Sequence, residues 1–292
     1  MGKLIRIITS DGAVLAAAID STDLAARAEQ VHTSSATVTA AMGRLMAAAS
    51  MMGAMMKNQD DSITLRMAGG GPIGSLIAVS DRLGNARVTV TNPVVELPLN
   101  AKGKLDVAGA VGTDGLLSVI RDYKNGETQT GHSPIVSGEI GEDITYYFAA
   151  SEQIPTVCAL GVLVNPDLSV CAAGGILLQL LPGADDGIIE QIERNLTTLP
   201  SVSSMIQSGL TPMQMLEKAL AGFELELLEE LAPEYRCNCS RERVERVLIS
   251  LGKDELRRLG EERETTSVQC HFCEKRYDFT ADQLAALSSP AS

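Results

Sequence analysis

The chain has 292 residues, of which 45% are hydrophobic, and this length is enough for two or three domains. Its formal net charge is −13 at pH 7, and because residues 232–292 are nearly balanced, the acidity lies in residues 1–231. Acidity and the lack of Trp argue against nucleic-acid binding. No apolar run reaches the roughly 18 residues of a membrane span, and the N-terminal run is too short for a signal peptide, so we expect a cytoplasmic protein.

The N-terminal part alternates between strand and helix patterns. Two β-leaning runs, 4–9 and 13–19, flank Asp11-Gly12, which is a strong hairpin signal. Ser21 or Thr22 then caps a predicted helix to about Val31. A second helix is expected over 35–56, followed by strands over 62–67, 74–80 and 86–91.

Two features of this part could indicate binding. Six of the eleven methionines fall within 42–56, which is typical of a core helix but also of an adaptable apolar binding surface. The three glycines at 69–71 suggest a phosphate loop, but the Gly-Lys-Ser/Thr ending is missing. We therefore predict a core helix and a turn, and leave the role of 42–56 open.

The middle of the chain indicates strands without a catalytic site. A strand is expected over 116–121, a helix over 142–153, and two apolar runs over 154–164 and 168–178. Cys158 and Cys171 lie in these runs, so we expect inert core thiols with raised pKa values. Neither His32 nor His132 has a Ser or Cys nucleophile in a matching context, so no enzyme is predicted.

Residues 184–231 read as several short helices. One is expected over 186–197, and another begins at Thr211 with Pro212 in its first position. Isolated helices of about ten residues are marginal in water. We therefore expect these helices to dock on the strand-rich body and to be held partly by the C-terminal segment after them.

Four cysteines in two pairs dominate the C-terminal part: Cys237 with Cys239, and Cys270 with Cys273. Two thiol pairs joined by one loop can close a tetrahedral Zn²⁺ site. The surrounding cations would stabilise thiolates, which both bind metal and react with oxidants; they are Arg236, Arg241, Arg243, Lys275 and Arg276. His271 is expected outside the ligand set, because four thiolates already complete the shell.

The segment around these pairs has few large apolar side chains. Helices are expected over 241–251, 253–260 and 281–287, with a strand over 275–279. Such a segment forms a weak core, and a structural zinc would supply its folding free energy. The fold class is thus α+β: a strand-rich N-terminal core domain with packed helices (1–183), a helical linker region (184–231) and a small C-terminal zinc-binding domain (232–292).

This pattern resembles the redox-regulated heat-shock chaperone family of about thirty-three kilodaltons, a bacterial holdase. The resemblance rests on C-x-C followed about thirty residues later by C-x-x-C, together with Ser137 to Asp143, Ser151 to Pro155 and Gly174 to Gly183. It spans the whole chain, and the four ligand positions show no departure from it.

The resemblance implies a redox switch. The reduced chain would hold one Zn²⁺ on the four cysteines and be inactive. Oxidants with unfolding stress would form the disulfides Cys237–Cys239 and Cys270–Cys273, release zinc and disorder the C-terminal module and linker. The exposed apolar surface would then bind unfolded or oxidatively damaged client proteins without ATP, and the oxidised form can be a homodimer.

Two other functional classes fit parts of the pattern. A zinc-ribbon adaptor without redox regulation would explain the cysteines alone, and it would keep its metal under peroxide. An oxidoreductase using C-x-x-C is disfavoured, because His271-Phe272 lies in no thioredoxin-like βαβ context.

Overall fold

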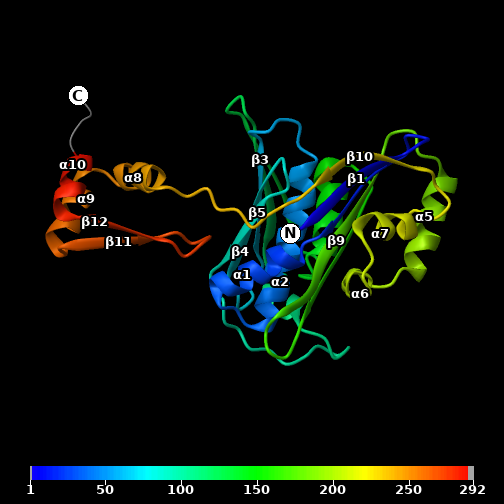
Figure 1. The fold of residues 1–292 in the computed structure, drawn as a ribbon, viewed down its shortest axis with the longest axis horizontal. Coiled ribbons are helices and arrows are strands. Elements are labelled where there is room, and N and C mark those ends of the chain that lie inside the picture. Colours follow the sequence, from blue (N-terminus) through cyan, green and yellow to red (C-terminus); the bar gives the residue numbers. More distant parts are fainter. Residues whose placement is uncertain (1, 289–292) are drawn as a thin grey trace. The chain divides into compact units, whose positions relative to one another are not determined.

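The computed structural model describes residues 2–288. The chain divides into two compact units, Met1–Arg236 and Cys237–Ser292. The first unit contains two five-stranded sheets in which every neighbouring pair is antiparallel. The first sheet has the order β10-β1-β2-β9-β8, and the second sheet has the order β5-β4-β3-β6-β7 (Figure 1). The predicted α+β class is confirmed.

The strands of the first unit are β1 (Lys3–Thr9), β2 (Val14–Asp20), β3 (Ser62–Ala68), β4 (Ser75–Asp81), β5 (Ala86–Val90), β6 (Leu116–Asp122), β7 (Thr128–Pro134), β8 (Thr156–Val164), β9 (Val170–Leu180) and β10 (Leu225–Leu231). Its helices are α1 (Thr22–His32), α2 (Ala36–Ala54), α3 (Val107–Val111), α4 (Gly141–Tyr147) with the π-turn η1 (Phe148–Glu152), α5 (Asp186–Thr198), α6 (Val202–Gln207) and α7 (Pro212–Ala219).

Helix α2 packs against strands of both sheets and forms the centre of the main core (Figure 1). Its many alanines let strands approach closely, while Met42, Met46 and Met51 fill the space with no exposed surface. Methionine suits this role because its unbranched side chain adapts to irregular gaps. The prediction of a core helix over 35–56 is confirmed.

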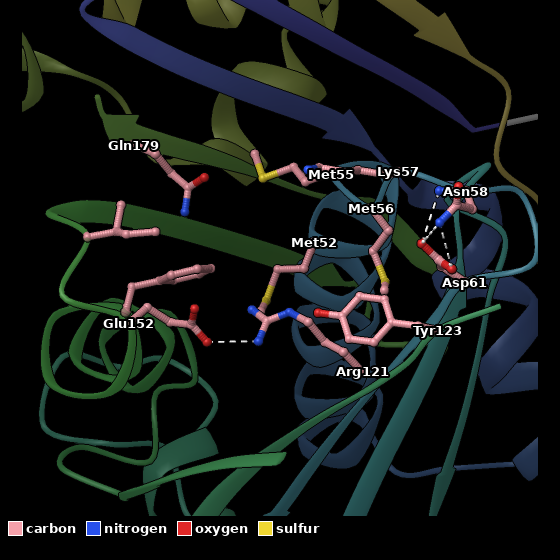
Figure 2. Close-up of a pocket in the computed structure, with 12 residues that line it drawn as sticks. Met52, Met55, Met56, Lys57, Asn58, Asp61, Arg121, Tyr123, Glu152 and Gln179 are labelled. Carbon is pink, nitrogen blue, oxygen red and sulfur yellow. Dashed lines mark hydrogen bonds and ion pairs between the residues drawn. The ribbon is translucent and has the colours of Figure 1, made fainter. Parts of the chain in front are cut away.

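The C-terminal end of α2 borders a cavity of about 340 Å³ (Figure 2). Met52, Met55 and Met56 line it, and Met55 is partly exposed. On another wall, Arg121 forms an ion pair of 2.8 Å with Glu152. Burial disfavours the charge on Glu152, but hydrogen bonds from Tyr147 and Arg121 outweigh it and lower its pKa.

The first sheet has an apolar layer on each face. Alternate residues of β2 belong to different layers. Ala17 and Ile19 belong to the main core with α2, whereas Ala16 and Ala18 belong to a second core. That second core is completed by α6 and α7, which supply Met205 and Met215. The short helices therefore dock on the strand-rich body, as their marginal length predicts.

The three glycines at 69–71 form a turn, as predicted. The amide of Gly71 donates to the carbonyl of Val111 at 3.0 Å. A Cβ on Gly71 would lie 2.3 Å from the carbonyl oxygen of Ala110. The glycines are thus required by close backbone approach, which accounts for them without a phosphate.

Strand β10 corrects the prediction that residues 184–231 are helical throughout. Its sequence, Leu225 to Leu231, consists of leucine and glutamate, a helix-favouring composition, but every residue except Leu228 pairs with β1. Tertiary context overrides propensity here. Strand β7 was also missed, because Thr128–Pro134 is polar and mostly exposed and lacks an apolar alternation.

Candidate metal centre

The second unit is built from α8 (Arg241–Ser250), α9 (Lys253–Glu262), β11 (Thr265–Gln269), β12 (Arg276–Thr280) and α10 (Ala281–Ser288). The predicted elements are present, and β11 is an additional strand that pairs with β12. Among the described residues, the buried part of its core comprises Leu248, Leu256, Tyr277, Phe279 and Leu284. The prediction of a small apolar core is confirmed.

Two local structures present the four thiols. Cys237 and Cys239 lie on the extended segment that enters α8, where the side chain of Ser240 caps the helix by accepting from the amide of Arg243 at 3.3 Å. Cys270 and Cys273 lie in the turn between β11 and β12. The carbonyl of Cys270 accepts from the amides of Cys273 at 3.4 Å and Glu274 at 2.9 Å, which closes the turn.

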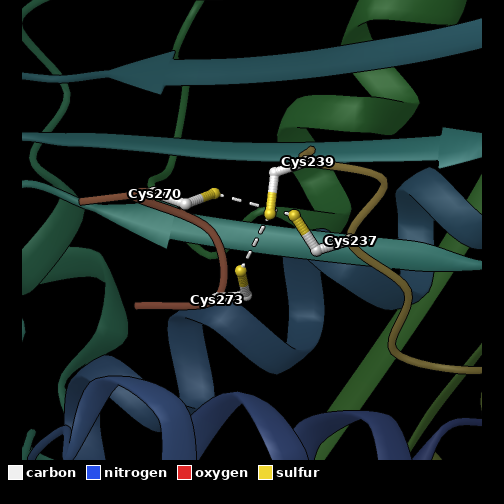
Figure 3. A group of neighbouring side chains, drawn as sticks. All are labelled: Cys237, Cys239, Cys270 and Cys273. Atoms are coloured by element: carbon white, nitrogen blue, oxygen red, sulfur yellow. Dashed lines mark hydrogen bonds between the residues drawn. The ribbon is translucent and has the colours of Figure 1, made fainter. Parts of the chain in front are cut away.

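The four sulfur atoms converge (Figure 3). All lie within 4.8 Å of one another, with 3.7 Å between Cys237 and Cys270 and 3.3 Å between Cys239 and Cys273. A tetrahedral zinc with Zn–S bonds of about 2.3 Å requires sulfurs about 3.8 Å apart. The thiols therefore fit a single metal ion of this kind, and their soft sulfur donors suit zinc.

The thiols differ in their tendency to ionise. Burial opposes ionisation of Cys239, but hydrogen bonds from the Tyr277 hydroxyl, at 3.1 Å, and from neighbouring thiols lower its pKa to about 7. Burial raises the pKa values of Cys237 and Cys273. Tyr277 was not anticipated from the sequence; the one available signal is that a buried tyrosine hydroxyl usually needs a partner.

The predicted cations have structural contacts of their own. Arg241 lies 4.3 Å from the centre of the Phe279 ring and donates to the carbonyl of Asp278 at 3.0 Å. Arg243 donates to the carbonyl of Asn238 at 3.1 Å and thereby fixes the loop between the first two cysteines. His271 is exposed and outside the sulfur cluster, as expected.

The comparison with protein families identifies the lineage of this site. The family model described as "Hsp33 protein" matches residues 2–280, which is nearly the whole chain. The chain belongs to the Hsp33 family. The resemblance inferred from the cysteine spacing and the three other segments is confirmed.

Relatives in the Hsp33 family match over almost their full length. The chain is 46% identical to a 33 kDa chaperonin of Geobacillus sp. over 288 residues, covering 99% of this chain and 97% of the relative. It is 47% identical to a 33 kDa chaperonin of Bacillus licheniformis, covering 98% of this chain and 99% of the relative. The crystal structure of the Thermotoga maritima 33 kDa chaperonin (HSP33) has a TM-score of 0.90 at 35% identity, covering 98% and 97% of the two chains.

These comparisons assign a chaperone role to this Hsp33 chain, and the relatives are named as chaperonins rather than as enzymes.

His32 Nε2 lies 2.9 Å from the carbonyl of Val88, and His132 Nδ1 lies 2.9 Å from the hydroxyl of Ser118. Both histidines thus contact strands of the second sheet.

Within residues 2–288, no helix has both the length and the apolar character to cross a membrane.

The two remaining cysteines of the Hsp33 chain differ from each other. Cys158 is buried, and burial raises the pKa of its thiol to about 12. Cys171 is only partly buried, with Gln207 Nε2 at 3.6 Å from its sulfur, which corrects the prediction of two core thiols. Its strand, β9, is buried along most of its length, but Cys171 lies near its first, more exposed end.

Alkylation should separate these two thiols. At pH 8 a thiol with a pKa of about 12 is ionised in roughly one molecule in ten thousand, and only the thiolate reacts. We expect iodoacetamide to modify Cys171 at least one hundredfold faster than Cys158 in the folded, reduced protein. Mass spectrometry of the two peptides measures the rates, and denatured protein, in which both should react alike, is the control. Equal rates in the folded protein would contradict this assignment.

Proposed function

We propose that this chaperone is an ATP-independent holdase that a thiol switch activates, and that it prevents aggregation of thermally unfolding and oxidatively damaged proteins. One observation carries the proposal. Four thiols that fit one metal ion lie in a unit whose described residues include five buried apolar core side chains. Folding of this unit therefore depends on the state of its cysteines.

In the reduced chain, Cys237, Cys239, Cys270 and Cys273 would hold one Zn²⁺. The bound ion supplies folding free energy, on the order of 10–16 kcal/mol in zinc-finger peptides. The side chains around the cluster contribute by positioning the donors: Tyr277 donates to the sulfur of Cys239, and Ser240 begins the helix after it. This form would be inactive.

Oxidation would remove the donors in pairs. In each pair, the two cysteine sulfurs give up two electrons to form one S–S bond, and one molecule of hydrogen peroxide takes up these electrons and two protons, from thiols or from water, to become two molecules of water. We propose the pairs Cys237–Cys239 and Cys270–Cys273, each within its own short segment. With all four donors consumed, the unit would lose its metal and unfold.

Unfolding of this unit would loosen the region we assign as a linker, 184–231. Its helices α5, α6 and α7 are short, and they cover one face of the first sheet. Their departure would expose apolar residues such as Ile5, Ala16 and Ile176 to client proteins. The proposed functional regions are thus the core (1–183), the linker (184–231) and the zinc-binding switch (232–292), acting in the cytoplasm and with dimerisation as an option of the oxidised form.

The test is aggregation of a thermally unfolding client, followed by light scattering with reduced or peroxide-treated chaperone. We expect the oxidised chain to suppress aggregation near equimolar ratio and the reduced chain to suppress at least tenfold less. Zinc release and loss of free thiols should accompany activation. Equal activity of both forms would refute the redox switch, and retention of zinc under peroxide would favour an unregulated adaptor.

Cys239→Ser is the informative variant for the same assay. It removes the donor whose pKa is lowered, so we expect zinc content to fall and activity to become independent of peroxide. Cys158→Ser is the matched control, because this buried thiol lies outside the cluster. Unchanged zinc content and regulation in Cys239→Ser would contradict the assignment of this ligand.

A further inference from the structure

The outer edge of the first sheet is closed by a strand that leads directly to the switch. Strand β10 pairs with β1 over Leu225–Leu231 and has no neighbour on its other side in the sheet order. The chain then pairs once more with the body, through backbone hydrogen bonds of Glu234 and Arg236 with Ala86. Cys237 is the next residue. If the switch unfolds, this short backbone pairing is the last attachment of the chain to the body after β10.

Strand β10 has little apolar attachment to the body. Leu227 and Leu228 are 54% and 49% exposed, and the pairing with β1 is irregular between Arg6 and Ile7. By contrast, most residues of the inner strand β9 are buried. Backbone pairing and polar contacts therefore hold β10 in place, and it is the strand of this sheet most easily removed.

The polar contacts centre on one carboxylate. Glu229 accepts from Arg6 Nη1 at 2.9 Å and from Arg82 Nη2 at 2.8 Å, and the two arginine side chains are only 15% and 16% exposed. Among the described residues, no acceptor reaches the buried Nε of Arg6 or the buried Nε and Nη1 of Arg82. Two cations with spare donors face one carboxylate, so this position selects an acidic side chain.

We propose that the β1 edge is a binding site for an extended client segment that carries an acidic side chain between apolar ones, and that β10 occupies this site in the reduced chain. The inference rests on the proposed function, because oxidation is what frees β10. An open strand edge offers a row of unpaired N–H and C=O groups, and an extended peptide can add to it. Arg6 and Arg82, left without Glu229, would then bind the acid of the incoming strand.

A labelled peptide tests this site on the full-length chain. The peptide carries the sequence of residues 225–231 within polar flanks, and fluorescence anisotropy measures its affinity for the reduced and oxidised forms. We expect at least tenfold tighter binding to the oxidised chain. Equal affinity for both forms would overturn the claim that β10 occupies the site.

Backbone methylation distinguishes strand addition from nonspecific apolar contact. The amide of Ser10 donates to the carbonyl of Glu224, so the alternation of antiparallel pairing points the amide of Glu226 toward β1 and that of Leu225 away. Methylating the peptide amide that corresponds to Glu226 should weaken binding at least tenfold. Methylating the one that corresponds to Leu225 is the control and should change affinity about twofold at most. Equal effects would refute strand addition.

The preference for an acidic side chain is tested by changing this residue in the peptide and Arg82 in the chaperone. A peptide with Gln in place of Glu229 should bind the oxidised chain about tenfold more weakly, and Arg82→Gln in the chaperone should reduce this difference, because only Arg6 then remains to bind the acid. Arg82→Lys should keep part of it, and Arg66→Gln, an exposed arginine on β3, should keep all of it. An undiminished difference in Arg82→Gln would refute the role of this side chain.

Failure of this inference can be told apart from failure of the proposed function. If oxidised chaperone suppresses aggregation but binds both methylated peptides alike, only the β1 site is refuted. If it suppresses no aggregation, the proposed function itself fails. If light scattering shows a dimer that excludes the peptide, β10 of a second copy fills the edge, and the client site proposed here is wrong.

Discussion

Removal of zinc from the reduced chain is expected to unfold residues 237–288, to loosen residues 184–231 and to leave the core around α2 folded. The described part of the second unit has five buried apolar core side chains, and domains of this size usually require a metal, disulfides or a partner. Metal binding contributes on the order of 10–16 kcal/mol in comparable peptides, which exceeds what such a core provides. Hydrogen exchange measured before and after chelation should show loss of protection in α8, α9 and the β11–β12 hairpin, with α2 protected throughout.

The variant Cys273→Ser should reproduce this loss without a chelator, because three thiols remain. His271→Ala is the matched control, since the neighbouring histidine is exposed and outside the cluster. Persistence of protection in the second unit after complete zinc removal would show that its apolar core suffices. The dependence of the switch on metal would then be wrong.

Asp143→Ala is expected to destabilise the first unit by about 3–5 kcal/mol, because it leaves four buried or partly buried amides without this acceptor. The carboxylate of Asp143 is fully buried and accepts from the amides of Val136 at 2.8 Å, Ser137 at 2.9 Å, Gly138 at 3.3 Å and Ile140 at 2.9 Å. Denaturant unfolding of the zinc-bound form, followed by far-UV circular dichroism, measures the change in the free energy of unfolding.

Two further variants keep this prediction testable if Asp143→Ala does not fold. Asp143→Asn keeps one acceptor oxygen and should cost less. Glu142→Ala, at the exposed neighbouring position in the first turn of α4, should cost under about 1 kcal/mol, since only an interaction with the helix dipole is lost. Similar losses for Asp143→Ala and Glu142→Ala would contradict the role of the buried carboxylate.

The Asp143 network also gives a physical reason for one stretch of the family resemblance. Residues 137–143 carry the sequence Ser-Gly-Glu-Ile-Gly-Glu-Asp, and its last residue folds the preceding loop back onto itself. Ile140 within that loop has a φ of 73°, which is unusual for a β-branched residue and is held by the hydrogen bond of its amide to Asp143. The sequence pattern drew attention to residues 137–143 but did not indicate the loop conformation in which Asp143 accepts from these amides.

Sequence patterns predicted best where one local signal dominates. Asp11-Gly12 between two β-leaning runs was sufficient to predict the β1–β2 hairpin, and the cysteine spacing was sufficient to predict that four thiols lie together. The pattern failed at β10, where leucine and glutamate favour a helix and a distant partner, β1, decides the outcome. It also placed Arg241 among the cations around the thiols but could not indicate that its guanidinium packs on Phe279, a contact that only the tertiary structure reveals.

The division of the first sheet into two separate apolar layers has a consequence for recovery after stress. The layer around α2 and the layer under α6 and α7 share no buried residue, although both use β1, β2 and β9. The outer layer can therefore be uncovered while the inner one stays intact. On return to reducing conditions, only the short helices would need to refold, because the sheet on which they pack would still be folded. Each molecule could then pass through several cycles of activation without being synthesised again.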